Sequence, residues 1–330
     1  MKKSLILTVL FSLTLFPGFG QQGDSLIQVT EKLYMISGLG GNATFLVTQE
    51  GVLLVDAGTV KKDGRAIEKH IRSVTDRPVK YLVYTHYHYD HANGACGLSD
   101  DPVIISHRYQ AQNLKAFGKG FLSMYRDENL QPRAKNLKEK ADSLKKIGDP
   151  GWEEVREKYD KVSELLADVE ETSIVFPDIR FSQNMELTLG SDTVNLIYAG
   201  ATHTKGNILV EFRNQNTLAT GDFFFNHCMP YIDYKAGSDT RNWVAQLKKF
   251  AGKKYRHVIP GHGNLAETKD LEKQLNYLTD LREAVKKGIT ENKSVESLKD
   301  KIKMQEYHDY GFQHMLPGEI EAVYKELKRK

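Results

Sequence analysis

Residues 83–91 of the chain read VYTHYHYDH and contain four side chains of types that commonly bind metal ions. Residues two apart in an extended segment point to the same side, so His86 and His88 can reach one ion together. A turn after them would direct Asp90 and His91 towards a second ion close to the first. Zinc prefers imidazole and carboxylate ligands, and iron and manganese follow. The segment therefore predicts a metal site at the end of the apolar strand before it.

Three more candidate ligands each follow a strand-like segment later in the chain. They are His203 after Val194–Tyr198, Asp222 after Thr217–Ala219, and His262 after Val258–Ile259. Glycines beside each of them allow the backbone to approach an ion closely. A solvated polar loop would explain one such histidine, but not five histidines and two aspartates at strand ends. This set suits two metal ions about 3.5–4 Å apart.

The complete ligand set resembles that of the metallo-β-lactamase superfamily. The family's motifs occur in order as His86-x-His88-x-Asp90-His91, His203, Asp222 and His262, and Asp56 in Val55–Gly58 is similar to the family's early strand-end aspartate. The resemblance covers approximately residues 31–265, apart from a helical insertion. It implies an α/β fold, the αββα four-layer sandwich, with a dinuclear site at one edge of the sheets.

The resemblance also implies a role for each ligand. His86, His88 and His203 would bind the first metal, Asp90, His91 and His262 would bind the second, and Asp222 would bridge both. The expected cofactors are two zinc ions, with iron or manganese as other candidates, and a hydroxide between them would be the nucleophile. Zinc lowers the pKa of bound water to about 7. Asp90 would act as the catalytic residue that orients this hydroxide.

Asp222 narrows the expected chemistry. The β-lactamases of this family usually carry Cys or Ser at that position, whereas a bridging aspartate is similar to the thioesterases, lactonases and phosphodiesterases. The resemblance therefore implies a metal-dependent hydrolase that cleaves an ester, thioester, lactone or amide, β-lactams included, in a small molecule. Two alternatives remain open: a mononuclear iron oxygenase similar to the persulfide dioxygenases, and a phosphodiesterase on the same fold.

The rest of the chain indicates one α/β domain with helical additions. Strand-like runs alternate with a helix candidate at Lys62–Ser73, which is typical of layered α/β domains. Apolar residues at steps of three and four predict a helix hairpin within residues 108–172 and further helices from Thr268 onwards. We expect a single domain over 21–330, in which the insertion forms part of the wall or lid of the substrate pocket and C-terminal helices occupy about 268–330.

The first twenty residues have the features of a secretory signal peptide. Lys2 and Lys3 precede a 12-residue uncharged run from Leu5 to Phe16, and small residues occupy the cleavage positions before Gln21. A membrane span needs about 20 apolar residues, so the run is too short for an anchor. We therefore expect an exported protein, periplasmic or secreted, with no membrane anchor in its mature form.

Composition limits the partners and the covalent chemistry. Of the 330 residues, 40% are hydrophobic and 27% are charged, and the net charge of +3 is too small for a dedicated nucleic-acid-binding protein. We expect a small-molecule substrate and no nucleic-acid partner. The two cysteines, Cys96 and Cys228, follow two of the ligand motifs, and the sequence leaves open whether they form a disulfide or remain two free thiols.

Overall fold

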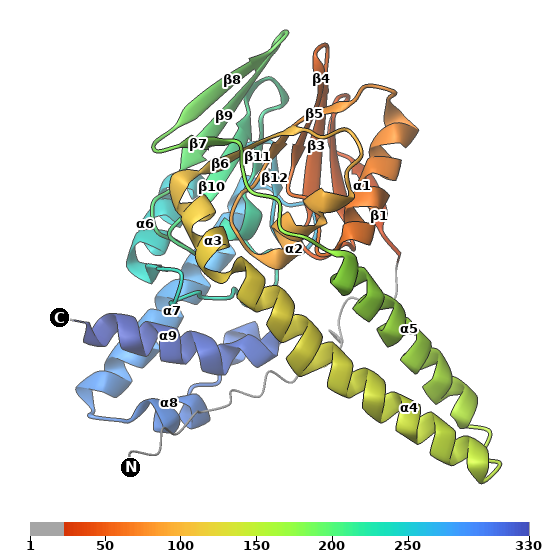
Figure 1. Cartoon of the computed structure of the whole chain (residues 1–330). Helices are drawn as coiled ribbons and strands as arrows, with labels where there is room; N and C mark the ends of the chain where they lie inside the picture. Colours follow the sequence, from red (N-terminus) through yellow and green to blue (C-terminus); the bar gives the residue numbers. More distant parts are fainter. Residues whose placement is uncertain (1–22, 330) are drawn as a thin grey trace.

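Two β-sheets packed face to face form the centre of the molecule, and helices cover their outer faces (Figure 1). This computed structural model describes residues 23–329, so the predicted signal peptide at 1–20 lies outside the described residues. Leu, Ile and Val side chains from both sheets, with Phe212 and Met35, form the core between them. The expected αββα four-layer sandwich is confirmed.

The first sheet has seven strands in the order in which they occur along the chain. They are β1 Ser25–Gln28, β2 Leu33–Ser37, β3 Ala43–Thr48, β4 Gly51–Val55, β5 Val79–Val83, β6 Val103–His107 and β7 Ile179–Phe181. The first four strands pair antiparallel, and β4 to β7 pair parallel. All residues of β4 are buried, as expected for a strand that is covered on both faces.

The second sheet has five strands in the order β12-β11-β10-β9-β8. They are β8 Met185–Leu189, β9 Asp192–Tyr198, β10 Ile208–Phe212, β11 Thr217–Ala219 and β12 His257–Ile259. Only β11 and β12 pair parallel. Asn42, which precedes β3, connects the two sheets, because its side-chain amide donates to the carbonyls of Pro260 and Gly263 at 2.9 Å each.

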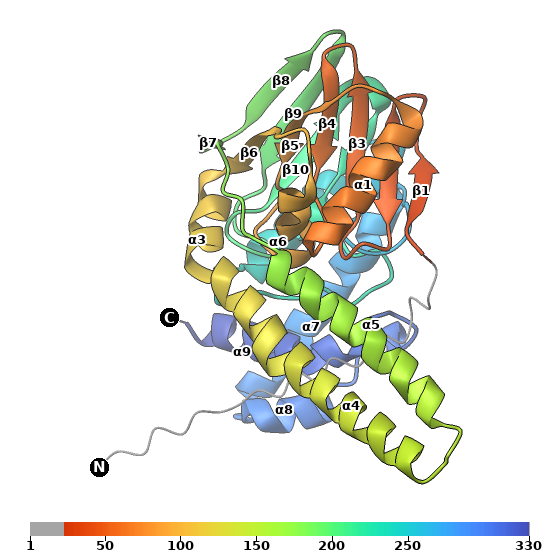
Figure 2. The same cartoon turned by 45° about the vertical axis from the view of Figure 1, so that its right-hand side comes forward.

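Helices form the two outer layers of the sandwich. These layers include α1 Lys61–Val74, α3 Arg108–Ser123, α6 Thr240–Ala251 and α7 Leu271–Thr290. The helices α2 Tyr89–Ala92, α8 Val295–Lys301 and α9 Leu316–Lys328 lie at or beyond one end of the sheets (Figure 1). Helix α1 crosses between the parallel strands β4 and β5 and buries Ile67 and Ile71 against the first sheet (Figure 2). Trp243 and Leu247 of α6, with Leu278 of α7, pack against the second sheet.

Shorter helical segments connect these elements. Single 3-10 turns lie at Asn93–Gly97, Arg213–Gln215, Gly221–Phe223, Thr268–Asp270, Gln305–Tyr307 and Gln313–Met315. The last two belong to the connection between α8 and α9, within the C-terminal region where the sequence predicts helices.

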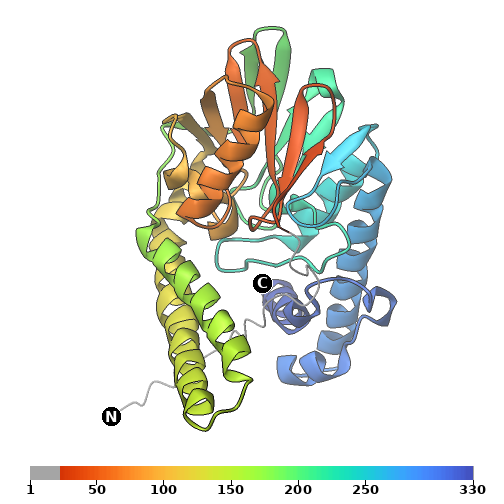
Figure 3. The same cartoon turned by 90° about the vertical axis from the view of Figure 1, so that its right-hand side faces the viewer.

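A helical hairpin extends from the end of the sheets that also carries α2 (Figure 1). Helix α3 runs into a π-helix at Met124–Leu130 and then into α4, Gln131–Lys146, and after a turn α5, Trp152–Glu171, returns alongside α4. At the base of the hairpin, Leu130, Ala134 and Val162 form a small separate core. The hairpin and the C-terminal helices α7 to α9 leave the sandwich on the same side (Figure 3).

Several elements were not expected from the sequence. Strands β1 and β7 are edge strands of four and three residues with largely exposed side chains, and they lack the apolar runs that mark the central strands. Helix α6 and the π-helix were also missed. Both cysteines are free thiols, with Cys228 buried beside Gly311 and Cys96 beside Ser173. Within residues 23–329, no helix is long and apolar enough to cross a membrane.

Candidate metal centre

All seven predicted ligands meet at one edge of the sandwich, where the strands that precede them end. The His86–His91 segment follows β5 of the first sheet, and the other three ligands follow β9, β11 and β12 of the second sheet. His88 is the residue before α2, so this single helical turn is the change of direction that brings Asp90 and His91 back to the cluster. The two sheets therefore share one site.

The first group consists of His86, His88, His203 and Asp222, all of them buried. His88 Nδ1 lies 3.0 Å from His86 Nε2 and 2.9 Å from His203 Nε2. Asp222 Oδ2 lies 3.5 Å from His86 Nε2 and 3.4 Å from His203 Nε2. Three imidazole nitrogens and one carboxylate oxygen thus surround a common centre, as in a four-coordinate metal site.

The second group consists of Asp90, His91 and His262. Asp90 Oδ2 lies 3.2 Å from His262 Nε2 and 3.8 Å from His91 Nε2. The other oxygen of Asp222, Oδ1, lies 3.1 Å from His91 Nε2 and 3.4 Å from His262 Nε2. The Asp222 carboxylate therefore stands between the two groups and presents one oxygen to each.

Asp56 holds His91 in place. Its carboxylate lies 2.8 Å from His91 Nδ1 and accepts hydrogen bonds from the backbone N–H and the hydroxyl of Thr85, at 2.8 and 2.7 Å. The backbone of Asp56 has a φ of 60°, which is uncommon and strained for a residue other than glycine. This contact occupies Nδ1 of His91 and leaves Nε2 for a metal ion.

Asp233 has the same relation to His88, although no motif in the sequence marks it as a site residue. It lies in the loop between β11 and α6, and its carboxylate is 2.9 Å from His88 Nε2. It also accepts a hydrogen bond from the Tyr87 hydroxyl, and the backbone N–H of Ala236 donates to its other oxygen at 3.0 Å. A single aspartate outside any motif shows its role only through these tertiary contacts.

Two histidines of the first group, His86 and His203, favour the neutral form that binds metals. Burial, followed by the nearby His91, lowers the pKa of His86 well below its usual value. Burial and the adjacent His88 lower the pKa of His203 to about 4. Both imidazoles therefore carry a free ring nitrogen at neutral pH.

In the second group, the carboxylates of Asp90 and Asp222 control the protonation of His262. Although burial opposes the charge, Asp222 and Asp90 raise the pKa of His262 to about 9. Burial also opposes ionisation of Asp90, yet His91 and His262 hold its pKa at about 2. A cation at this position would stabilise both carboxylates and displace a proton from His262, so that its binding is linked to pH.

The residues present fit two metal ions. His91 Nε2 and Asp222 Oδ1 are buried without a hydrogen-bond partner, although an unpartnered buried polar atom costs about 1–3 kcal/mol. Both atoms point into the second group, where an ion would satisfy them. Nitrogen and carboxylate donors in this number suit zinc, iron or manganese. The cluster therefore fits a dinuclear metal site.

The site is accessible at one side. The side chains of Asp90 and His262 are 17% and 15% exposed, whereas those of His86, His91 and His203 are fully buried. Phe225 stacks on His262 with ring centroids 5.2 Å apart, and the preceding Phe223 and Phe224 are buried in the core. A reactant would therefore approach the cluster past Asp90 and His262.

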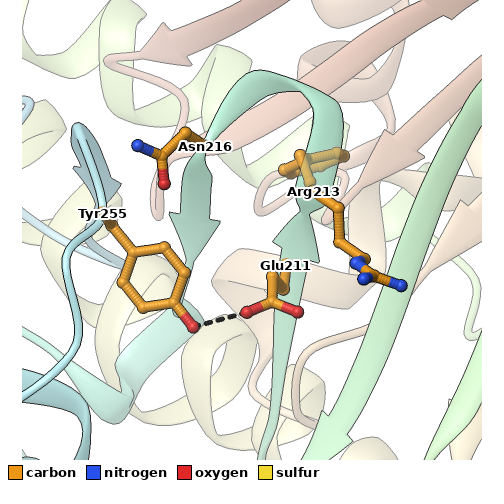
Figure 4. A pocket seen from close by; sticks show the side chains of 5 residues that line it. Glu211, Arg213, Asn216 and Tyr255 are labelled. Atoms are coloured by element: carbon orange, nitrogen blue, oxygen red, sulfur yellow. Dashed lines mark hydrogen bonds between the residues drawn. The ribbon is translucent and has the colours of Figure 1, made fainter.

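A separate small pocket of about 190 Å³ lies between β10 and β11 (Figure 4). It is lined by Glu211, Phe212, Arg213, Asn216 and Tyr255, at the end of β11 opposite to the metal centre. The Tyr255 hydroxyl donates to the Glu211 carboxylate at 2.6 Å, and Asn195 donates to its other oxygen at 2.8 Å. These contacts give Glu211 a structural role, and none of the predicted ligands lines this pocket.

Comparison with known sequences places this geometry in context. Residues 36–262 match the family model of the metallo-beta-lactamase superfamily. The linear primary-alkylsulfatase of Pseudomonas sp. (strain ATCC 19151) is 22% identical over 273 residues, which are 76% of this chain and 48% of that protein. The (R)-specific secondary-alkylsulfatase of Pseudomonas sp is 31% identical over 108 residues, 32% of this chain and 16% of that protein. The chain thus spans half the length or less of these curated relatives.

Solved structures show the same fold. The stereoselective inverting sec-alkylsulfatase from Pseudomonas sp. matches with a TM-score of 0.66 and 15% identity, covering 92% of this chain and 50% of that one. The metallo-beta-lactamase from Pontibacter korlensis matches with a TM-score of 0.54 and 18% identity, covering 78% of this chain and 99% of that one. At these identities, the likeness concerns the fold.

Proposed function

The chain belongs to the metallo-β-lactamase superfamily, and from this we propose that its cluster is the active site of a dinuclear zinc hydrolase. The substrate is a small molecule with an ester, thioester, lactone or amide bond, and ester bonds are the leading choice. The alkylsulfatase relatives support hydrolysis as the reaction type.

One observation carries the proposal: the Asp222 carboxylate divides its oxygens between two groups of ligands. Oδ2 lies 3.4–3.5 Å from histidines of the first group, and Oδ1 lies 3.1–3.4 Å from those of the second. A mononuclear iron oxygenase would use the first group and leave Asp90, His91 and His262 without a role. The geometry therefore favours the dinuclear hydrolase over that alternative.

The residues of the chain divide the remaining tasks. Zinc ions held here would polarise the scissile group and bring the pKa of a water molecule to about 7. Asp90, which stays ionised with a pKa of about 2, accepts a hydrogen bond from the attacking water at the accessible side of the site. Asp56 and Asp233 keep His91 and His88 oriented, so that the geometry is in place before the substrate arrives.

Hydrolysis of alkyl sulfates is a second candidate function. The matched curated relatives are both alkylsulfatases, and the sec-alkylsulfatase structure covers 92% of this chain against 78% for the metallo-beta-lactamase structure. A sulfate ester and a carboxylic ester differ at the reacting atom but share the organic group. One panel of substrates therefore tests both candidates.

The test combines metal analysis with hydrolysis assays on the protein reconstituted with zinc, iron or manganese. We expect about two zinc ions per chain and hydrolysis of at least one member of a panel of aryl esters, thioesters, lactones, β-lactams, alkyl sulfates and phosphodiesters. Asp90→Asn should lower kcat by about 10²-fold or more, with Lys235→Ala as an exposed control.

Fewer than one bound metal per chain, or zinc-loaded protein that hydrolyses no substrate, would refute the proposal. Iron-dependent oxygen uptake would select the oxygenase.

We also propose that the protein is exported, on the basis of the residues before Gln21. In the native host, N-terminal sequencing of the protein from the periplasmic or extracellular fraction should find a chain that begins at Gln21. An intact Met1 in the cytoplasmic fraction would contradict this.

A further inference from the structure

Four aromatic side chains surround the metal centre, and each comes from a different part of the chain. They are Phe121 of α3, Tyr125 of the π-helix, Tyr231 of the loop before α6, and Phe312 of the connection between α8 and α9. We call these four residues the aromatic rim. All four are only partly buried. None of them was a candidate from the sequence.

The rim residues contact the metal ligands or the tyrosine between them. Phe121 packs on His88 with ring centroids 5.8 Å apart, and Tyr231 packs on the same histidine at 5.5 Å. Phe312 meets His262 edge to face at 5.5 Å. Tyr125 stacks on Tyr89 at 5.8 Å, next to Asp90. The rim therefore borders both ligand groups, including the accessible side of the site.

Two rim residues occupy unusual backbone conformations. Phe312 has a φ of 61°, which is a strained, left-handed conformation for a phenylalanine. Hydrogen bonds of the preceding Gly311 hold it there, from its N–H to the carbonyl of His227 and from the N–H of Met229 to its carbonyl, both at 2.9 Å. Tyr125 lies in the π-helix, a form found often at functional sites. The strained backbone at Phe312 and the π-helix at Tyr125 therefore both point to a functional role for these segments.

The charges near the rim do not favour a second anionic group on the substrate. The principal charged or ionisable neighbours of Tyr89 are Asp90, Tyr125, Tyr231 and Asp222. The principal charged neighbour of Tyr231 is Asp233. Tyr125 has Arg133 nearby, but Asp63 and Asp90 stand beside it as well. Carboxylates and phenols are thus the main charged or ionisable groups around Tyr125 and Tyr231.

We propose that the aromatic rim binds the apolar organic group of the substrate, so that the enzyme acts on esters of medium-length alkyl or aryl groups. This inference rests on the proposed function and applies equally to carboxylic and sulfate esters, because only the organic group enters the rim. Substrates with a further anionic group, such as dinucleotides or glutathione thioesters, are disfavoured.

The experiment measures the effect of chain length in two ways. Alkanesulfonates from ethane- to octanesulfonate are titrated into the zinc-loaded protein by calorimetry, and kcat/KM is measured for p-nitrophenyl esters from acetate to octanoate. Burial of one additional methylene group increases an affinity or a kcat/KM about threefold to fourfold. We expect both binding and kcat/KM to rise about threefold per methylene over the first four to six carbons.

Variants in two separate segments test the rim itself. Phe312→Ala and Tyr125→Ala should each reduce the gain to less than about twofold per methylene, whereas Phe312→Leu should retain most of it. Phe176→Ala, which removes a phenylalanine that is 47% exposed and lies outside the rim, should keep the gain of the unmodified protein. Metal content and circular dichroism verify that each variant is folded and loaded.

The outcomes separate this inference from the proposed function. Hydrolysis without any dependence on chain length, or the same dependence in both alanine variants, would overturn the role of the rim while the hydrolase remains. Chain-length-dependent sulfonate binding that Phe312→Ala weakens, in a protein that hydrolyses no substrate of the full panel, would support the rim and refute the hydrolase.

Discussion

Glu319 lets us predict how the stability of this protein depends on pH. The residue lies on α9 and is 1% exposed, and the hydroxyl of Tyr277 on α7 donates a hydrogen bond to its Oε2. Its Oε1 has no partner. Burial raises the pKa of this carboxyl from 4.5 to about 8, so the folded protein keeps a proton that the unfolded chain releases.

The sign and size of the effect follow from this shift. Because the folded state binds more protons between pH 4.5 and 8, the free energy of unfolding falls as the pH rises through this range. For a pKa of about 8, the loss between pH 5 and pH 8 is about 3.5 kcal/mol. Glu319→Gln keeps the shape of the protonated carboxyl and removes the titration. The variant should therefore match the unmodified protein near pH 5 and exceed its stability by about 3.5 kcal/mol at pH 8.

Urea unfolding of the metal-loaded proteins at several pH values measures this difference, with the fluorescence of buried Trp243 as the signal. Comparison of the two proteins cancels the pH dependence of the shared metal site. Glu321→Gln on the same helix is the matched control, because contacts with Lys299 and Lys325 lower the pKa of Glu321 and its effect should be constant above pH 5. A stability difference for Glu319→Gln that changes by less than about 0.5 kcal/mol from pH 5 to pH 8 would refute the reasoning.

Three further predictions concern the metal centre. Asp233→Ala should weaken zinc binding by about 10–100-fold, because His88 loses the partner of its Nε2; an unchanged affinity in competition with a chelator would contradict this. Gly261→Ala should abolish binding of at least one ion, because the new Cβ would lie 2.1 Å from Asp222 Oδ1, whereas Gly318→Ala, with no atom within 4 Å, should leave the metal content intact. Removal of the metals should lower the melting temperature, because bound zinc stabilises the folded state by about 1.4 kcal/mol for each tenfold by which the free zinc concentration exceeds Kd. Calorimetry with and without a chelator measures this shift, and an unchanged unfolding midpoint would contradict the prediction.

The candidate ligands could be identified from the sequence because their signal is local. His86, His88, Asp90 and His91 follow one apolar strand at a spacing that leaves few other interpretations, and the remaining ligands repeat the same arrangement of strand, small residues and ligand. Their order along the chain carries the resemblance to the superfamily, and the sandwich follows from it. The structure brings all seven ligands together without exception.

The supporting residues were not predictable in the same way. Asp233 and the rim residues act through contacts with partners far away in the chain, as between Asp233 and His88 or Phe312 and His262, and no spacing rule reveals such contacts. The π-helix has an ordinary helical sequence. Helix α6 is different, because Trp243, Leu247 and Phe250 follow helical spacing and that signal was available.

The division of the ligands between the two sheets has a consequence for biosynthesis. His86 to His91 come from the first sheet, whereas His203, Asp222 and His262 come from the second. A chain that has been synthesised only as far as the helical hairpin lacks a ligand of both groups, and the second group stays incomplete until residue 262 has been added and the sheets have docked. In the proposed dinuclear site, full occupancy therefore requires that both sheets have folded against each other.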